Sequence, residues 1–166
     1  MNRKGQIFST DSLLALVVFT LVVALTAALI QQFQLTGEDA REQQADSSRT
    51  QRILYSLLSS PGIPSYWEDA GDWNAVSLIG LSDGGGFISP SKWSALQDWN
   101  GEDYPSLLSH FGIPDRNFYL SMWDLNHSLI EETGLPPVDA NTVSSITLPS
   151  LYEGEIVMVQ LQVHTQ

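Results

Sequence analysis

Cysteine is absent from the 166 residues and basic residues are few, since seven Lys and Arg stand against 19 Asp and Glu. Without cysteine, the chain forms no disulfide and carries no thiolate chemistry. Nucleic-acid binding needs clustered Lys and Arg to neutralise phosphates, so a formal net charge of −12 argues against it. The carboxylates are consistent with a strongly solvated exterior, whereas 43% apolar residues and five Trp are typical of a folded protein.

Motifs for catalysis or metal binding are also missing. There is no Gly-x-Ser-x-Gly, and His110, His127 and His164 are not spaced as metal ligands. The run 83–86 (DGGG) lacks the Lys-Ser/Thr of a phosphate loop and the alternating acids of a calcium loop, so we interpret it as a turn. We therefore predict no enzyme activity, no cofactor and no metal site. Solvated surface charge is preferred over peripheral calcium binding for Glu68, Asp69, Asp72, Glu102 and Asp103.

One long apolar run dominates the chain. From Leu13 to Ile30, 18 residues contain no charge, Gly or Pro. As a helix they span roughly 27 Å, close to the ~30 Å hydrocarbon core of a bilayer. A secretory signal peptide has a shorter core followed by a small-residue cleavage site, which 31–34 (QQFQ) does not provide. A plain membrane anchor and a pilin-type helix, which packs into a filament after processing, both fit this run.

Charged residues flank the apolar run on its N-terminal side. Arg3 and Lys4 precede it and the first charges after it are acidic, which places the N-terminus in the cytoplasm and everything after residue 35 outside. Asp11, just before the N-terminal end of the apolar run, is a residue type that is favoured as a helix N-cap. It is also a possible docking partner for the basic leader or N-terminal amine of a neighbouring subunit, since an unpaired charge among apolar groups is costly. The two roles are compatible.

The beginning of the chain resembles the archaeal type IV pilin-like proteins, which carry a class III signal peptide. The resemblance rests on the short basic leader 1–5 (MNRKG), on Gln6 and on the Leu-rich 12–16 (SLLAL). It implies cleavage between Gly5 and Gln6 by a prepilin peptidase, followed by assembly on a membrane platform. The family places Ser two residues and an acid four residues after the Gln. Here those positions hold Phe8 and Thr10, and the acid comes one residue later.

The apolar helix is expected to carry assembly. Burial of its side chains against those of other subunits would stabilise a filament, while the hydroxyls of Thr20 and Thr26 can bond to carbonyls of the preceding turn. The side chains expected at this interface are Leu13, Leu14, Leu16, Val17, Val18, Phe19, Leu21, Val22, Val23, Leu25 and Leu29, together with Asp11.

The helical pattern continues beyond the apolar run. Ile53, Leu54, Leu57 and Leu58 form a stripe that predicts docking on a globular domain, and 61–62 (PG) ends the helix. A kink at Gly37, or a flexible stalk over residues 35–50, remains open because an all-polar helix is marginal alone. We predict a leader over 1–5, a helix over 6–60 (apolar 12–34, amphipathic 38–60) and a head over 61–166.

The head mixes helical and strand patterns. A strand is predicted over 75–81, and helices over 90–99 (broken by 100–101, NG) and 104–111. Hairpins are predicted from 118–123 with 128–131 and from 143–148 with 156–163, the core face of the last strand being Val157, Val159, Leu161 and Val163. The fold class is therefore α+β: a long hydrophobic N-terminal helix, then short helices and a C-terminal antiparallel β-sheet.

Further motifs concern the cell surface. The segments 57–62 (LLSSPG), 79–81 (IGL), 111–114 (FGIP) and 118–120 (FYL), with Trp67, are similar to membrane-anchored proteins of methanogen-type archaea. The sequon 126–128 (NHS) predicts glycosylation of Asn126.

Together these features predict a structural subunit of an archaeal type IV pilus-like filament for adhesion or surface attachment. Its partners would be copies of itself, the membrane before assembly, and the peptidase and platform. The alternative is a membrane-anchored surface protein that does not polymerise, such as an adhesin, a minor pilin or a secretion-system component.

Overall fold

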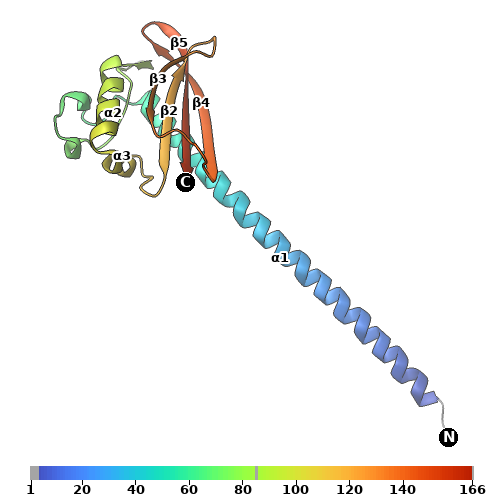
Figure 1. Cartoon of the computed structure of the whole chain (residues 1–166). Coiled ribbons are helices and arrows are strands. Elements are labelled where there is room, and N and C mark those ends of the chain that lie inside the picture. Colours follow the sequence, from blue (N-terminus) through green and yellow to red (C-terminus); the bar gives the residue numbers. More distant parts are fainter. Residues whose placement is uncertain (1–3, 85, 166) are drawn as a thin grey trace. The chain divides into compact units, whose positions relative to one another are not determined.

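The computed structural model describes the backbone of residues 4–84 and 86–165, and side chains within 12–31, 44–84 and 86–165. The chain begins with α1 (Lys4–Ser59) and divides into two compact units, Met1–Gln44 and Ala45–Gln166, which we describe separately (Figure 1). We call the second the globular unit. It contains the end of α1, then η1 (Trp67–Asp69), η2 (Trp73–Ala75), β1 (Phe87–Ile88), α2 (Pro90–Glu102), α3 (Tyr104–His110), β2 (Asn117–Trp123), β3 (Leu129–Gly134), β4 (Thr142–Tyr152) and β5 (Glu155–Thr165).

The helix α1 is continuous through Gly37, and residues 35–50 are helical rather than an irregular stalk. It ends at Ser59, just before Pro61 and Gly62, as the sequence predicts. The predicted stripe is confirmed: Leu54, Leu57 and Leu58 are buried and Ile53 packs against the core. Tertiary packing therefore stabilises the last turns of a helix whose preceding segment is polar.

The fold is α+β, but its sheet is mixed rather than purely antiparallel. The strand order is β1-β4-β5-β2-β3, and β1 pairs in parallel with β4. The predicted antiparallel sheet is wrong at this edge. Two residues, Phe87 and Ile88, are too few to show a periodicity in the sequence. They join the sheet because the loop before them pairs back on itself through a bridge between Ser82 and Ile88.

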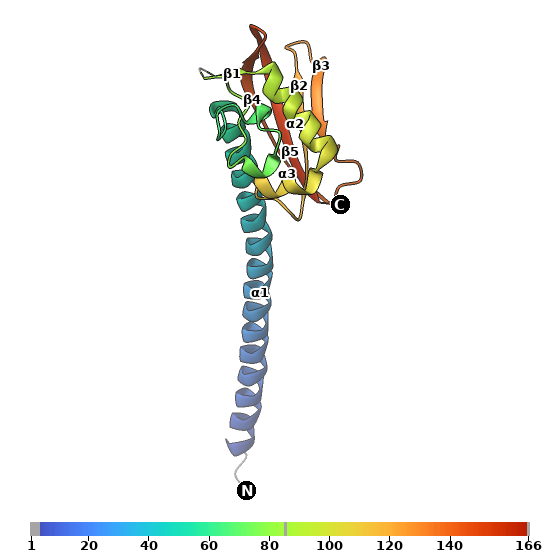
Figure 2. The same cartoon turned by 90° about the vertical axis from the view of Figure 1, so that its left-hand side faces the viewer.

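Both predicted hairpins are present. The two-residue turn between β4 and β5 uses Glu153 and Gly154, both with positive φ (51° and 87°), as a tight hairpin turn requires. The predicted inner face of β5 is confirmed, since Val157, Val159, Leu161 and Val163 are all buried. Figure 2 shows α2 and α3 over one face of the sheet, so the core lies between these helices and that face.

The predicted strand over 75–81 does not form. Its backbone groups bond elsewhere: Leu81 N–H donates to the Leu57 carbonyl (2.7 Å), and Leu78 makes only an isolated bridge with Ile63. The predicted break of the helix at 100–101 is also wrong, because α2 continues to Glu102. The next residue, Asp103, accepts a hydrogen bond from Ser106 N–H (3.1 Å) and caps α3 instead.

Three buried tryptophans build the core beside α2. Trp67, Trp93 and Trp99 are each at most 1% exposed. The indole N–H of Trp67 donates to the Gly80 carbonyl at 2.7 Å, and Trp73 stacks on Trp99 with ring centres 4.8 Å apart. The aromatic residues of this region thus pack mainly against one another rather than forming an open platform for a ligand.

Candidate functional site: an exposed apolar helix

The apolar stretch of α1 has the length of a membrane span. Ser12–Gln31 is a 20-residue helical segment that qualifies by length and composition, and none of it is buried within the described structure. At 1.5 Å per residue it is about 30 Å long. A signal sequence would satisfy the same criteria, so this stretch is suited to a membrane span or a signal sequence.

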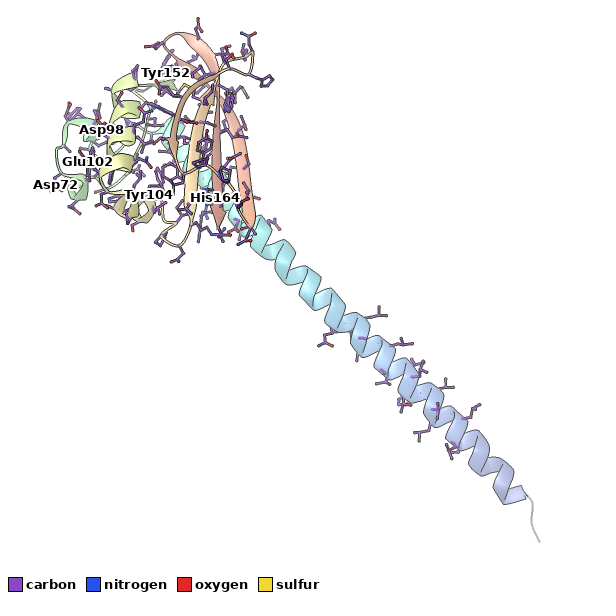
Figure 3. All side chains as sticks on the ribbon, in the orientation of Figure 1. Asp72, Asp98, Glu102, Tyr104, Tyr152 and His164 are labelled. Atoms are coloured by element: carbon purple, nitrogen blue, oxygen red, sulfur yellow. The ribbon has the colours of Figure 1, made fainter. Side chains whose placement is uncertain are left out.

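The side chains expected to carry assembly are all exposed. They range from 50% exposure at Val23 to 67% at Leu14, and sticks stand out around this part of the ribbon in Figure 3. Because Leu13, Leu14, Leu16 and Val17 follow one another around the helix, the surface is apolar on every side and not along one stripe. A helix that is apolar all round needs an apolar environment all round. The set comprises Leu13, Leu14, Leu16, Val17, Val18, Phe19, Leu21, Val22, Val23, Leu25 and Leu29.

The polar side chains within this stretch are satisfied by its own backbone. The Thr20 hydroxyl lies 3.0 Å from the Leu16 carbonyl and 2.9 Å from that of Val17, and the Thr26 hydroxyl donates to the Val22 carbonyl at 2.7 Å. This confirms the expectation for both threonines, and it lowers the cost of surrounding them with apolar groups. The backbone of Gly5, Gln6 and Asp11 is helical, but the side chains of Gln6 and Asp11 lie outside the described residues.

The sequon lies in the turn between β2 and β3. Asn126 is exposed, and the turn is ordered by the carboxylate of Asp124, which accepts the backbone N–H groups of Ser128 (2.7 Å) and Asn126 (2.8 Å). These bonds, with that from Ser128 first, lower the pKa of Asp124. His127 has a positive φ of 62°. The Asn126 side chain is therefore presented at a defined, exposed turn.

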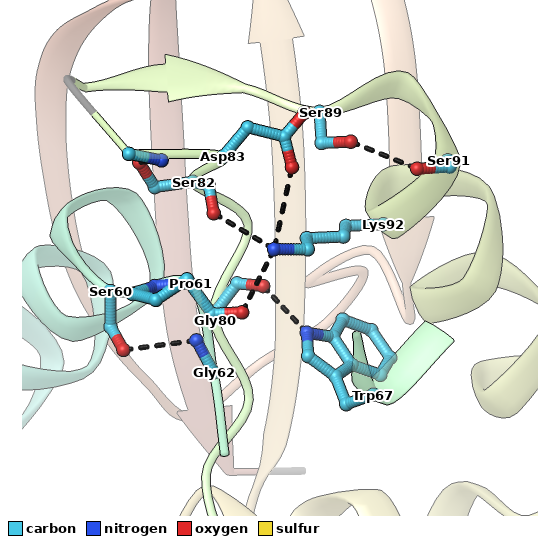
Figure 4. Close-up of polar contacts among 11 residues, drawn as sticks. Ser60, Pro61, Gly62, Trp67, Gly80, Ser82, Asp83, Ser89, Ser91 and Lys92 are labelled. Carbon is cyan, nitrogen blue, oxygen red and sulfur yellow. Dashed lines mark hydrogen bonds and ion pairs between the residues drawn. The ribbon is translucent and has the colours of Figure 1, made fainter. Parts of the chain in front are cut away.

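A buried lysine was missed by the sequence analysis. Lys92 is 2% exposed, and its ammonium donates to the carbonyls of Pro61 and Ser82, both at 2.9 Å (Figure 4). Asp83 Oδ1 lies 3.4 Å away. The periodicity contained the signal, since Lys92 is four and seven residues before the buried Leu96 and Trp99 and shares their helix face. Lys92 joins the end of α1 to the loop before β1.

The remaining polar candidates have structural partners. Asp72 caps η2 by accepting Asn74 N–H (2.9 Å), and Glu102 accepts the indole N–H of Trp73 (3.1 Å); both are labelled in Figure 3. His164 is buried and its Nε2 lies 2.9 Å from the Leu135 carbonyl. His127 lies in the sequon turn. Among the described residues, no group of three or more His, Asp and Glu could hold a metal ion.

Comparison of the chain with protein-family models, with curated proteins and with solved structures gave no match.

Proposed function

We propose that this chain is the structural subunit of an archaeal type IV pilus-like surface filament that serves adhesion or surface attachment. The observation that carries the proposal is the 20-residue helix of α1, which is apolar on every side and unburied. Its environment would be the membrane before assembly and the helices of other subunits afterwards. The resemblance of the leader and of Gln6 to archaeal type IV pilin-like proteins favours the filament over a simple anchor.

Burial of apolar surface would drive assembly. Fully burying one Leu, Val or Phe side chain contributes about 1.5–3 kcal/mol, and eleven such side chains on this helix are at least half exposed. The bilayer already provides an apolar environment, so packing between helices would have to compete with lipid. Cleavage between Gly5 and Gln6, by a prepilin peptidase, would release the helix from its basic leader for the assembly platform.

The acidic globular unit would lie outside the cell. Arg3 and Lys4 before the span place the N-terminus in the cytoplasm by the positive-inside rule. A glycan on Asn126 would then be attached at an exposed turn on the outer side, where it would keep a crowded filament surface soluble.

The first experiment is electron microscopy of material sheared from cells that express the full chain, with mass spectrometry of the N-terminus of the recovered protein. The proposal predicts fibres that contain this chain. A terminus at Gln6 would demonstrate cleavage, and one at Met1 would show assembly without it. Protein confined to the membrane fraction, with no fibres, would instead identify an anchored surface protein that does not polymerise.

Substitution of one side chain of the apolar helix tests the mechanism of assembly. An Asp at the centre of a membrane helix costs about 2.5–3.5 kcal/mol, so Val18→Asp should abolish filaments. The matched control is Val138→Asp, which makes the same change at a side chain of the globular unit that is 67% exposed. This control should leave the filament yield unchanged. Normal filaments from Val18→Asp would refute this mechanism.

A further inference from the structure

The four basic residues of the globular unit differ in their partners. Lys92 pairs with Asp83 and Arg116 with Asp46. Within residues 44–84 and 86–165, Arg49 and Arg52 form no ion pair, although acids far outnumber bases in the chain. Both are exposed, and three residues apart on α1 they lie on the same side of the helix. Two exposed guanidinium groups thus lie close together on a strongly acidic protein.

These two arginines line a groove of about 330 Å³. Its other walls include Ile53 of α1, Leu78, and Phe111 after α3, so the groove is apolar beneath a basic rim. His110 forms a fixed wall, because its two ring nitrogens lie 2.9 Å and 3.0 Å from backbone carbonyl oxygens of Ser106 and Val76. The groove is suited to an apolar side chain that is flanked by carboxylates.

The turn between β4 and β5 has this complementary chemistry. Glu153 and Glu155 are exposed at the turn, and Ile156 beside them is 54% exposed. Register places Leu151 and Phe87 in the same row across the sheet as Ile156, and Phe87 is 48% exposed. The end of this hairpin is therefore an apolar surface with two carboxylates at its tip.

The arginine end of the groove lies far from the hairpin turn of the same globular unit. Thr50, next to Arg49, lies 3.0 Å from the hydroxyl of Ser144 near the start of β4. The hairpin turn follows Tyr152, eight residues further along the strand, which is roughly 26 Å at 3.3 Å per residue. Figure 1 likewise shows α3 and the C-terminal end of β5 at one end of the sheet and the start of β5 at the other. One copy cannot bring its own hairpin end into its own groove.

We propose that the groove at Arg49 and Arg52 binds the β4–β5 hairpin end of a second copy of this chain, with Glu153 and Glu155 facing the arginines and Ile156 entering the apolar floor. Two different surfaces make a heterologous contact, which repeats along an axis instead of closing into a dimer. The inference adds an axial contact between globular units to the helix packing, and as a contact within a filament it rests on the proposed function.

Charge reversal tests the contact in the full chain. The pair Arg49→Glu with Arg52→Glu should reduce filament yield roughly tenfold or more, because like charges would meet across the contact. Glu153→Arg with Glu155→Arg should do the same, and all four changes in one chain should restore the yield by exchanging the signs. The control, Asp69→Arg with Asp98→Arg, changes charge at two other exposed acids and should have no such effect. Loss without restoration in the fourfold variant would overturn the inference.

Disulfide trapping separates this inference from the proposed function, since the chain contains no cysteine of its own. Ser56→Cys in the groove wall with Glu155→Cys at the hairpin end should give a ladder of linked copies after oxidation on whole cells, read on a non-reducing gel. Each single variant should give none. A ladder without fibres would contradict the filament and keep the contact. Fibres without a ladder, with normal yield from the charge variants, would refute the contact and leave the groove to a different anionic ligand.

Discussion

The guanidinium of Arg116 lies 2.7 Å from the carboxylate of Asp46, joining the first residues of α1 within the globular unit to the segment before β2, 70 positions later. Both side chains are about three-quarters buried, at 25% and 23% exposure. The nearby Thr50 hydroxyl bonds to Ser144 at the start of β4. Polar contacts with the segment before β2 and with the start of β4 therefore hold this part of α1. They act in addition to the buried stripe of Leu54, Leu57 and Leu58.

Replacing Arg116 should weaken this attachment. We expect Arg116→Met to lower the free energy of unfolding by about 1–2 kcal/mol, because Asp46 would lose a charge-assisted hydrogen bond in a largely buried position. The measurement is chemical denaturation of the full chain in detergent micelles, followed by tryptophan fluorescence. Arg52→Met is the control, since Arg52 is exposed and bonds within its own helix. Equal effects of the two variants would show that the ion pair contributes nothing specific.

The hydrogen bonds of Lys92 should contribute more to the free energy of unfolding than those of any other polar side chain described in the globular unit. Lys92→Met should cost about 3 kcal/mol, because the Pro61 and Ser82 carbonyls would lose their donor beside a buried apolar chain. Asp83→Asn should cost less than about 1 kcal/mol, since the side chain of Asp83 is 57% exposed. The same denaturation assay compares them. A larger loss in the Asp83 variant would mean that the ion pair dominates over the carbonyl bonds.

Two glycines should respond to alanine in opposite directions. A Cβ at Gly80 would lie 2.1 Å from the Ser60 carbonyl oxygen and 2.5 Å from Gly62 N, so Gly80→Ala should destabilise by about 3 kcal/mol. At Gly101, within α2, a Cβ meets nothing within 4 Å, so Gly101→Ala should stabilise by up to about 1 kcal/mol. Thermal unfolding of both variants checks the pair. A tolerated Gly80→Ala would contradict the close approach of the 75–81 segment to the end of α1.

Stability should fall in alkaline solution because of Tyr119. Desolvation, together with its hydrogen bond to the Glu132 carboxylate and that group's charge, raises the pKa of this phenol to about 12. Because the pKa is raised in the folded state, the stabilisation from protonated Tyr119 is fully present below its unfolded-state pKa of about 10. This stabilisation is lost as the pH rises toward 12. Burial also raises the pKa of Tyr104 and Tyr152. Ionisation of each of these two phenols should therefore also lower the free energy of unfolding at alkaline pH.

Ultraviolet titration of phenolate formation measures this shift. Tyr119→Phe should remove the step near pH 12, and Glu132→Gln should move it toward the ordinary range, because the neutral amide no longer repels the phenolate. An unchanged titration in the Glu132 variant would show that burial alone is responsible.

Elements with a clear periodicity could be predicted from the sequence. The uncharged run from Leu13 to Ile30, the stripe at 53–58 and the alternation in β5 each follow from the spacing of apolar residues. The turn of the second hairpin is consistent with its sequence, since Gly154 is a residue type that a tight hairpin turn favours. These features depend on local pattern alone, and the structure contains all of them.

Features that depend on distant partners could not be predicted. The segment 75–81 is apolar enough for a strand, but its amides bond to the Ile63 carbonyl and, from Leu81, to the Leu57 carbonyl of α1, which local pattern cannot reveal. The parallel pairing of β1 depends on two residues meeting Leu151 and Tyr152. The groove at Arg49 and Arg52 likewise combines α1 with residues near 78 and 111. Only the fold brings these segments together.

The burial of Lys92 has a practical consequence for chemical labelling. The sequence contains two lysines, and the other, Lys4, precedes the apolar run. The only lysine of the globular unit, Lys92, is 2% exposed and therefore poorly accessible to aldehyde fixatives and amine-reactive dyes. Such reagents should react with it slowly while the protein is folded and rapidly once it opens. Amine reactivity would then serve as a built-in reporter of unfolding, and a thiol introduced elsewhere would be the unique handle for imaging.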